Sequence, residues 1–140
     1  MGLPQSNGEA AMAHQPIDPD SVVVLEVPNY THGAVSEGAT RWLHLSGQVG
    51  VKPDGKTAEG PLAQCQQALA NIGALLAAAG MSVADIVHMR IFLLDRADIP
   101  ALRQARGEFL GTRVVPSTLV LVSGLVDPAW KVEIEVVAAR

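Results

Sequence analysis

The chain has 140 residues, of which 49% are hydrophobic and 17% charged, so it can bury one core and carries too little charge to be disordered. Ten Lys and Arg residues against fourteen Asp and Glu residues give a net charge of −4, without the basic stripe that a nucleic-acid backbone needs. Only two Trp, one Tyr and two Phe residues could stack on bases. We therefore expect one globular domain with no nucleic-acid partner.

The first twenty residues combine Gly, Pro and polar side chains without an apolar period, which predicts a flexible tail followed by a single domain over residues 21–140. The N-terminus lacks the basic and apolar segments of a signal peptide. The most apolar run, residues 68–81, is too short to cross a bilayer. These features predict a cytoplasmic protein with no membrane partner.

Periodicity along the chain predicts an α+β domain. A β-branched run, Ser21 to Val27, predicts a strand, and Thr40 to Val51 predicts a second strand that is interrupted at Gly47. Pro61 opens a segment with apolar residues every three or four positions up to Gly80, which predicts an amphipathic helix. The remaining predicted elements are a strand over Ile86–Leu94, a helix over Ile99–Leu110 that ends at Gly111, and strands over Thr118–Val122 and Trp130–Ala138.

This order of elements predicts a sheet with both helices packed on one face. In two predicted strands, at Val22–Leu25 and Leu119–Val122, apolar residues point to both sides of the sheet. The face without helices therefore needs another cover, and the sequence predicts a homo-oligomer.

Few residues suggest chemistry by spacing alone. The four His residues and the single Cys65 never form a metal-ligand pattern, so no metal is expected, and Cys65 lies on the apolar stripe of the first helix as a core residue. Gly47 within a strand marks either a bulge or a close backbone approach to a ligand. Glu133 and Glu135 share one face of the last strand, where they are either a general base or solvated acids.

Four segments resemble the Rid family of reactive intermediate deaminases, also called YjgF-like or endoribonuclease L-PSP. They are LSGQVGV (45–51), QCQQALANIGALLAAAGMSVADIV (64–87), MRIFLLDRADIPALRQARGEFLG (89–111) and KVEIEVVAA (131–139). The resemblance implies a chorismate mutase-like fold with a six-stranded mixed sheet, in a homotrimeric barrel with clefts between subunits. It also implies hydrolysis of an imine or enamine to a 2-keto acid and ammonia, without a cofactor.

Carried over residue by residue, the resemblance implies that Glu133 is the catalytic glutamate that orients water. It also implies that Tyr30, Ser46 and Gly47 contact a small-molecule substrate. His32, near Tyr30, is a candidate proton carrier or a bystander.

The chain departs from the family at the substrate's carboxylate clamp. Deaminating members have an Arg after a Pro before the penultimate strand, and here Val115-Pro116 is followed by Ser117, with Leu119 where many members have Cys. Arg103 and Arg113 are the candidates to replace the missing cation, against the alternative that both are surface arginines.

Three functions follow from these features. The first is a cofactor-independent Rid-type hydrolase of a small imine, enamine or related nitrogen compound. The second is a non-catalytic trimer that binds a small metabolite, suggested by Ser117 in place of Arg. The third is an endoribonuclease or translation inhibitor, which the net charge and the few aromatic residues disfavour.

Overall fold

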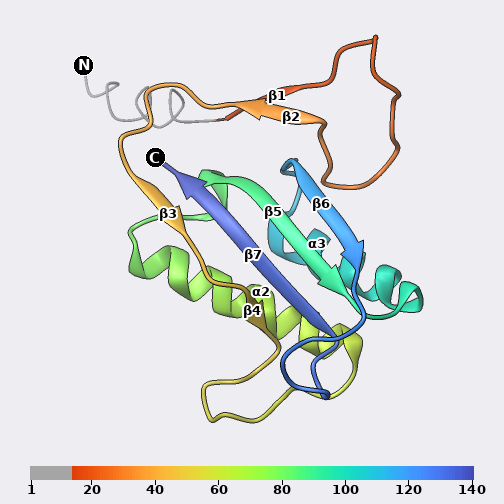
Figure 1. Ribbon diagram of the computed structural model, residues 1–140. Coiled ribbons are helices and arrows are strands. Elements are labelled where there is room, and N and C mark those ends of the chain that lie inside the picture. The colour runs from red at the N-terminus through yellow and green to blue at the C-terminus, as the bar shows by residue number, and fades with distance from the viewer. Residues whose placement is uncertain (1–13) are drawn as a thin grey trace.

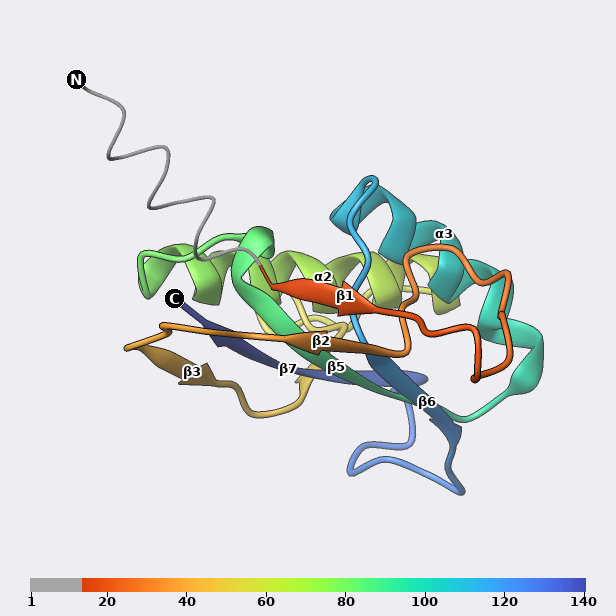
Figure 2. The ribbon, with the colours of Figure 1, turned by 90° about the horizontal axis from the view of Figure 1, so that it is seen from above.

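A computed structural model of the protein describes residues 14–140 and places two helices on one face of a mixed β-sheet (Figures 1 and 2). The sheet order is β3-β7-β5-β6, and β4 also pairs with β7. Only β5 and β6 run parallel. The five strands are β3 (Trp42–His44), β4 (Gln48–Val49), β5 (Ile86–Leu93), β6 (Ser117–Leu121) and β7 (Val132–Ala139). The predicted α+β class is confirmed.

The two long helices, α2 (Pro61–Ala78) and α3 (Ile99–Leu110), begin and end as the sequence predicts. Pro61 occupies the first turn of α2, where its missing N–H costs nothing. Gly111 ends α3 at a φ of 64°, in the left-handed region that favours glycine. Two short 3-10 turns, η1 (Val83–Asp85) and η2 (Arg96–Asp98), precede β5 and α3.

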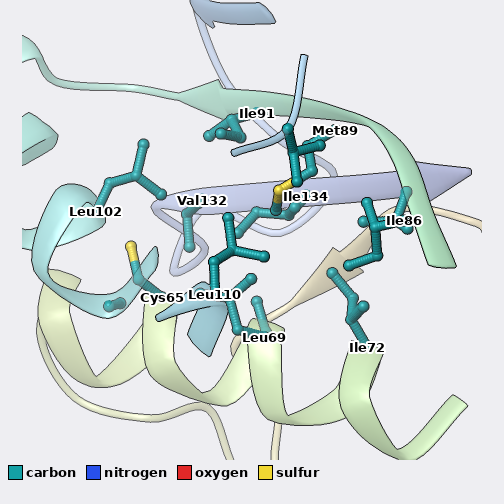
Figure 3. Close-up of a cluster of buried hydrophobic side chains, with 14 of the residues drawn as sticks. Cys65, Leu69, Ile72, Ile86, Met89, Ile91, Leu102, Leu110, Val132 and Ile134 are labelled. Carbon is teal, nitrogen blue, oxygen red and sulfur yellow. The ribbon is translucent and has the colours of Figure 1, made fainter. Parts of the chain in front are cut away.

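The hydrophobic core lies between the helices and the sheet (Figure 3). The buried stripe of α2 faces the buried residues of β7, where Val132, Ile134 and Val136 alternate with half-buried neighbours. Cys65 lies within this core, and burial together with the negative charge of Asp98 raises the pKa of its thiol to about 11. Cys65 is therefore a core residue, as predicted, and not a nucleophile.

The N-terminal part differs from the prediction. Ser21–Val27 is not a strand, and the side chains of Val22 to Leu25 are 40 to 79% exposed. A segment of high strand propensity forms a strand only where another strand can pair with it. In this segment the Val23 carbonyl instead accepts a hydrogen bond from the His32 side chain. The main sheet therefore has five strands where six were expected.

A separate two-stranded sheet pairs β1 (Gln15–Ile17) with β2 (Gly33–Val35). Gly33 leaves room for the Ile17 side chain across this pair, because a Cβ there would lie 3.1 Å from Ile17 Cγ1. Strand β1 falls within the segment predicted as a tail, whose first thirteen residues lie outside the described part of the chain. Within residues 14–140, no helix is long and apolar enough to cross a membrane.

Candidate functional site

Figure 2 shows that α2 and α3 lie on one side of the main sheet; the opposite side is called the open face below. The strand register assigns to it every second residue of β3, β5, β6 and β7. These residues are Trp42, His44, His88, Arg90, Phe92, Thr118, Val120, Glu133, Glu135, Val137 and Ala139.

Glu133 lies against the irregular segment that separates β3 from β4. A Cβ built on Gly47 would overlap the Glu133 carboxyl group, with its Cδ only 2.6 Å away. Only a glycine allows this approach, which explains the glycine between two strands. The adjoining Ser46 is exposed, and its carbonyl accepts a hydrogen bond of 3.1 Å from Gln48 Nε2. The structure therefore brings together Ser46, Gly47 and Glu133, three of the residues predicted for the site.

Two amide side chains of α2 hold the strands that carry these residues. Asn71 Nδ2 donates to the carbonyls of Val49 and Val51, at 3.1 Å each. The buried Gln64 donates to the Ala129 carbonyl at 3.1 Å and accepts from the Lys131 N–H at 2.9 Å, just before β7. One helix thus fixes the Gly47 segment and the entry to the Glu133 strand.

The importance of these amides did not emerge from the sequence, although a signal exists. Gln64 and Asn71 lie seven positions apart, so both project from the same side of the helix beside its apolar stripe. Gly50 is a second signal, because a Cβ there would lie 2.6 Å from the Gln64 Cα atom. Polar residues beside the apolar stripe of a helix, together with a glycine elsewhere in the chain, indicate that the helix packs closely against the backbone at that glycine.

Tyr30 and His32 form a pair elsewhere on the chain. Tyr30 forms an isolated parallel β-bridge with Val115, just before β6. Its ring packs edge to face against the His32 ring, with 5.4 Å between the ring centroids. His32 Nε2 donates to the Val23 carbonyl at 2.6 Å, which leaves Nδ1 to accept from the Tyr30 hydroxyl at 3.2 Å. Because β5 separates β6 from β7, one chain does not place Tyr30 beside Glu133.

The loop that carries Tyr30 is tied to α3 by a buried arginine. Arg106 donates from Nη2 to the Pro28 carbonyl at 3.1 Å, and only 4% of this residue is exposed. Burial and the charge of Arg103 lower the pKa of Arg106. Asn29 adds hydrogen bonds of 2.8 Å to the carbonyls of Gly111 and Arg113. Arg106 therefore positions the loop.

The register of β6 places Ser117 and Leu119 on one side of the strand and their neighbours on the other. Leu119 packs against the core, and Ser117 shares its phase of the strand, on the helix side. Their neighbours Thr118 and Val120 lie on the open face with Glu133. The substrate-binding roles of Ser117 and Leu119 stay predictions, and the register offers Thr118 and Val120 to the same site.

The two candidate cations lie away from the open face. Arg103 is an exposed residue of α3, on the helix side of the sheet, and Arg113 is exposed in the turn after α3. The open face carries a different cation, Arg90 of β5, whose Nε lies 2.9 Å from Oε1 of Glu135. Spacing alone did not mark Arg90, because its partner Glu135 is 45 residues further along the chain.

A cavity of about 140 Å³ adjoins this ion pair. Burial and the charge of Arg90 lower the pKa of His88, so its imidazole is neutral at neutral pH. Within residues 14–140, no three or more His, Cys, Asp and Glu side chains gather closely enough to hold a metal ion. The cavity is lined by His44, Leu45, His88, Arg90, Glu135, Val136 and Val137.

Comparison with known proteins matches this fold to one family. The family model described as Endoribonuclease L-PSP matches residues 24–140. A Rid-family protein of unknown function from Yersinia pestis superposes with a TM-score of 0.82 at 28% identity, over 92% of this chain and all of that one (100%). Escherichia coli TdcF with bound serine gives a TM-score of 0.67 at 28% identity, over 93% of this chain and 94% of that one.

A curated relative carries a named activity. The 2-iminobutanoate/2-iminopropanoate deaminase of Dermatophagoides farinae is 32% identical over 126 residues, which cover 89% of this chain and 88% of the relative. The family match over residues 24–140, together with the shared fold, shows that the chain belongs to the Rid/YjgF family, whose model is described as Endoribonuclease L-PSP.

Proposed function

We propose that this protein hydrolyses a small imine or enamine to the corresponding carbonyl compound and ammonia, without a cofactor. The observation that carries this proposal is the contact of Gly47 with the Glu133 carboxyl group on the open face. It leaves a carboxylate beside the half-buried backbone of Gly47 and close in the chain to the exposed Ser46, where a water molecule and a small polar substrate can both be held. The deaminase named among the relatives supports the same reaction.

Glu133 orients the attacking water and accepts one of its protons while the water oxygen bonds to the imine carbon. That proton passes to the substrate nitrogen to give a carbinolamine. Glu133 then moves the proton of the new hydroxyl group to the same nitrogen, so the carbon–oxygen double bond forms as the carbon–nitrogen bond breaks and ammonia leaves. Ser46 contributes its hydroxyl and Gly47 its backbone to the substrate. The contact of Gly47 with the Glu133 carboxyl group, and the position of Ser46 next to Gly47 in the chain, support these roles.

We propose that the active unit is a homotrimer with its sites between subunits. The open face exposes 53% of Trp42 and 40% of Val120, which is costly apolar surface for a monomer. Tyr30 is separated from Glu133 within one chain, and a neighbouring copy would supply it. Ultracentrifugation of the purified chain tests this state, and a monomer at micromolar concentration would contradict it.

The activity is tested by generating 2-iminopropanoate with an amino acid oxidase and timing its decay by semicarbazide trapping. We expect faster decay than in buffer, and a loss of about 100-fold or more in Glu133→Gln because the water loses its base. Glu59→Gln, which removes an exposed carboxylate before α2, is the matched control and keeps the wild-type rate. Wild-type decay no faster than in buffer would overturn the proposal.

A binding protein without catalysis is the second candidate, favoured by the absence of an Arg at Ser117 and by the bound serine in TdcF. It predicts thermal stabilisation by a small amino or keto acid without any acceleration of imine decay. The nuclease named in the family description predicts salt-dependent RNA binding instead, which the net charge of −4 disfavours. A filter-binding assay separates it from the other two.

A further inference from the structure

We propose that His32 positions the hydroxyl group of Tyr30 so that Tyr30 offers a lone pair, and not its proton, to the ligand of the site. The ligand then needs an N–H or O–H group that points at Tyr30, such as the nitrogen of an imine or an amine. This assignment rests on the function proposed above, because Tyr30 enters the shared site from a neighbouring copy. It differs from both interpretations that the sequence allows for His32, a proton carrier or a bystander.

The tautomer of His32 follows from its contact with the main chain. A backbone carbonyl oxygen can only accept, so Nε2, which lies 2.6 Å from the Val23 carbonyl oxygen, carries a hydrogen. In the neutral imidazole the other ring nitrogen, Nδ1, then has no hydrogen and can only accept. Nδ1 lies 3.2 Å from the Tyr30 hydroxyl oxygen, so the hydroxyl group is the donor in this hydrogen bond. The proton of Tyr30 is thereby directed at His32.

This direction determines what the Tyr30 hydroxyl can offer to a ligand. A hydroxyl group has one proton to donate and two lone pairs that accept. Within residues 14–140, His32 is the one hydrogen-bond partner of the Tyr30 oxygen, and Tyr30 is only half-buried. The lone pairs therefore serve a donor on the ligand, whereas a carbonyl or carboxylate oxygen of the ligand would find no proton there.

The main chain holds both residues of the pair in place. Tyr30 is fixed by its β-bridge to Val115. The Asp18 carboxylate accepts from the His32 N–H at 2.7 Å and from the buried Thr31 hydroxyl at 2.6 Å, and so closes the loop between β1 and β2 (Figure 1). The direction of the Tyr30 hydroxyl is therefore set before a ligand arrives, which lowers the entropy cost of binding.

A second pair of a hydroxyl group and an imidazole provides a matched control. His14 Nε2 lies 3.2 Å from the Ala139 carbonyl oxygen, and His14 Nδ1 lies 2.6 Å from the Ser36 hydroxyl oxygen. The same argument makes Ser36 the donor. His14 precedes β1 and Ser36 follows β2, whereas His32 precedes β2, so the two pairs lie at opposite ends of the two-stranded sheet.

The first experiment uses the fact that Tyr30 is the single tyrosine of the chain. The tyrosine Fermi doublet in the Raman spectrum reports, by its intensity ratio, whether the phenol donates or accepts hydrogen bonds. At about pH 8, where an ordinary imidazole is neutral, we expect the ratio of a donating phenol. His32→Gln keeps an amide N–H for the Val23 carbonyl but lacks Nδ1, so the ratio should change to that of a hydrated phenol. The control His14→Gln should leave it unchanged.

The second experiment asks whether the site uses this hydrogen bond. The kcat/KM for 2-iminopropanoate is measured in Tyr30→Phe, in His32→Gln and in the double variant. We expect each single change to lower it about tenfold, as for the loss of one hydrogen bond, while His14→Gln keeps the wild-type value. The double variant should lose no more than Tyr30→Phe alone, because His32 acts through the hydroxyl. His32→Asn places an amide oxygen near the position of Nδ1 and should retain more activity than His32→Gln.

A purely structural role of His32 would lower kcat/KM further in the double variant, and such additive losses would overturn the assignment. An unchanged Raman ratio in His32→Gln would also overturn it. Hydrolysis with additive losses would keep the proposed reaction and reject this role of His32.

If the wild type does not hydrolyse the imine, the proposed function fails, and the same variants are compared by their calorimetric affinity for serine, whose ammonium group supplies the N–H. Non-additive losses of serine affinity in Tyr30→Phe and His32→Gln would keep the role of His32 without the reaction. Equal affinities in all variants, or no binding, would reject both.

Discussion

The two faces of the main sheet are built from the same strands but carry different kinds of side chain. Along β7, Val132, Ile134 and Val136 face the helices and are at most 1% exposed, while Glu133 and Glu135 alternate with them on the open face. The helix side maximises apolar burial, which stabilises the fold. The open side carries the half-buried carboxylates of Glu133 and Glu135, which contribute little apolar burial. Three matched pairs of substitutions test this division.

Two glycines only three residues apart should respond in opposite ways. Gly50→Ala forces a Cβ into the backbone of Gln64 in α2, which cannot move aside, and should cost about 3 kcal/mol of folding free energy. At Gly47→Ala the new Cβ meets the Glu133 side chain first, which can rotate away, so stability should change little while imine hydrolysis falls. Urea unfolding and the semicarbazide assay measure the two effects.

Equal losses of stability in both glycine variants would show that Glu133 is held as rigidly as the helix backbone. The open face would then be part of the packed structure and not a site with a movable carboxylate. Full activity in Gly47→Ala would separate Gly47 from the chemistry.

Adjacent valines on β7 provide the second pair. Val136→Ala removes two buried methyl groups from the core and should cost about 2 kcal/mol. Val137 lies half-buried on the open face, and Val137→Ala should cost less than half as much in a dilute monomer. If a second copy covers this face, the cost of Val137→Ala will rise with protein concentration. Urea unfolding at two concentrations distinguishes these results.

The sequence predicts the helix side of the sheet well, because burial leaves a local period. The spacing of Leu69, Ile72 and Leu76, and the glycine after α3, can be read without knowing what they contact. A local pattern is not sufficient in segment 21–27, because its β-branched run has high strand propensity but no strand to pair with.

The open face was harder to predict because its residues are related only through the register. Nothing in the chain marks Arg90 and Glu135 as neighbours, and a shift of one residue in β6 exchanges Ser117 for Thr118 on the site side. Gly47 and Glu133 were both selected from the sequence, yet their contact is a property of the fold. Local sequence patterns identify candidate site residues, and the strand register determines which of these residues lie close together.

The third pair concerns pH and has the smallest effect. Well below pH 9 the Cys65 thiol is protonated in both states, but between about pH 9 and 11 the unfolded chain releases the proton while the folded chain keeps it. Stability should therefore fall as pH rises through this range, by about 1 kcal/mol at pH 10. Cys65→Ala should remove this fall, measured as the difference between wild type and variant in urea unfolding at pH 8 and pH 10.

His88, on the open face, has the opposite dependence. Its pKa is lowered by burial and by Arg90, so the unfolded chain binds a proton more readily and stability falls as pH drops below about 6.5. His88→Gln should remove part of the acid loss and leave the alkaline loss intact, whereas Cys65→Ala should do the reverse. An alkaline loss that persists in Cys65→Ala would mean that other groups, not the buried thiol, control stability at high pH. The helix side and the open face would then no longer differ in whether their titrating groups lower stability at high or at low pH.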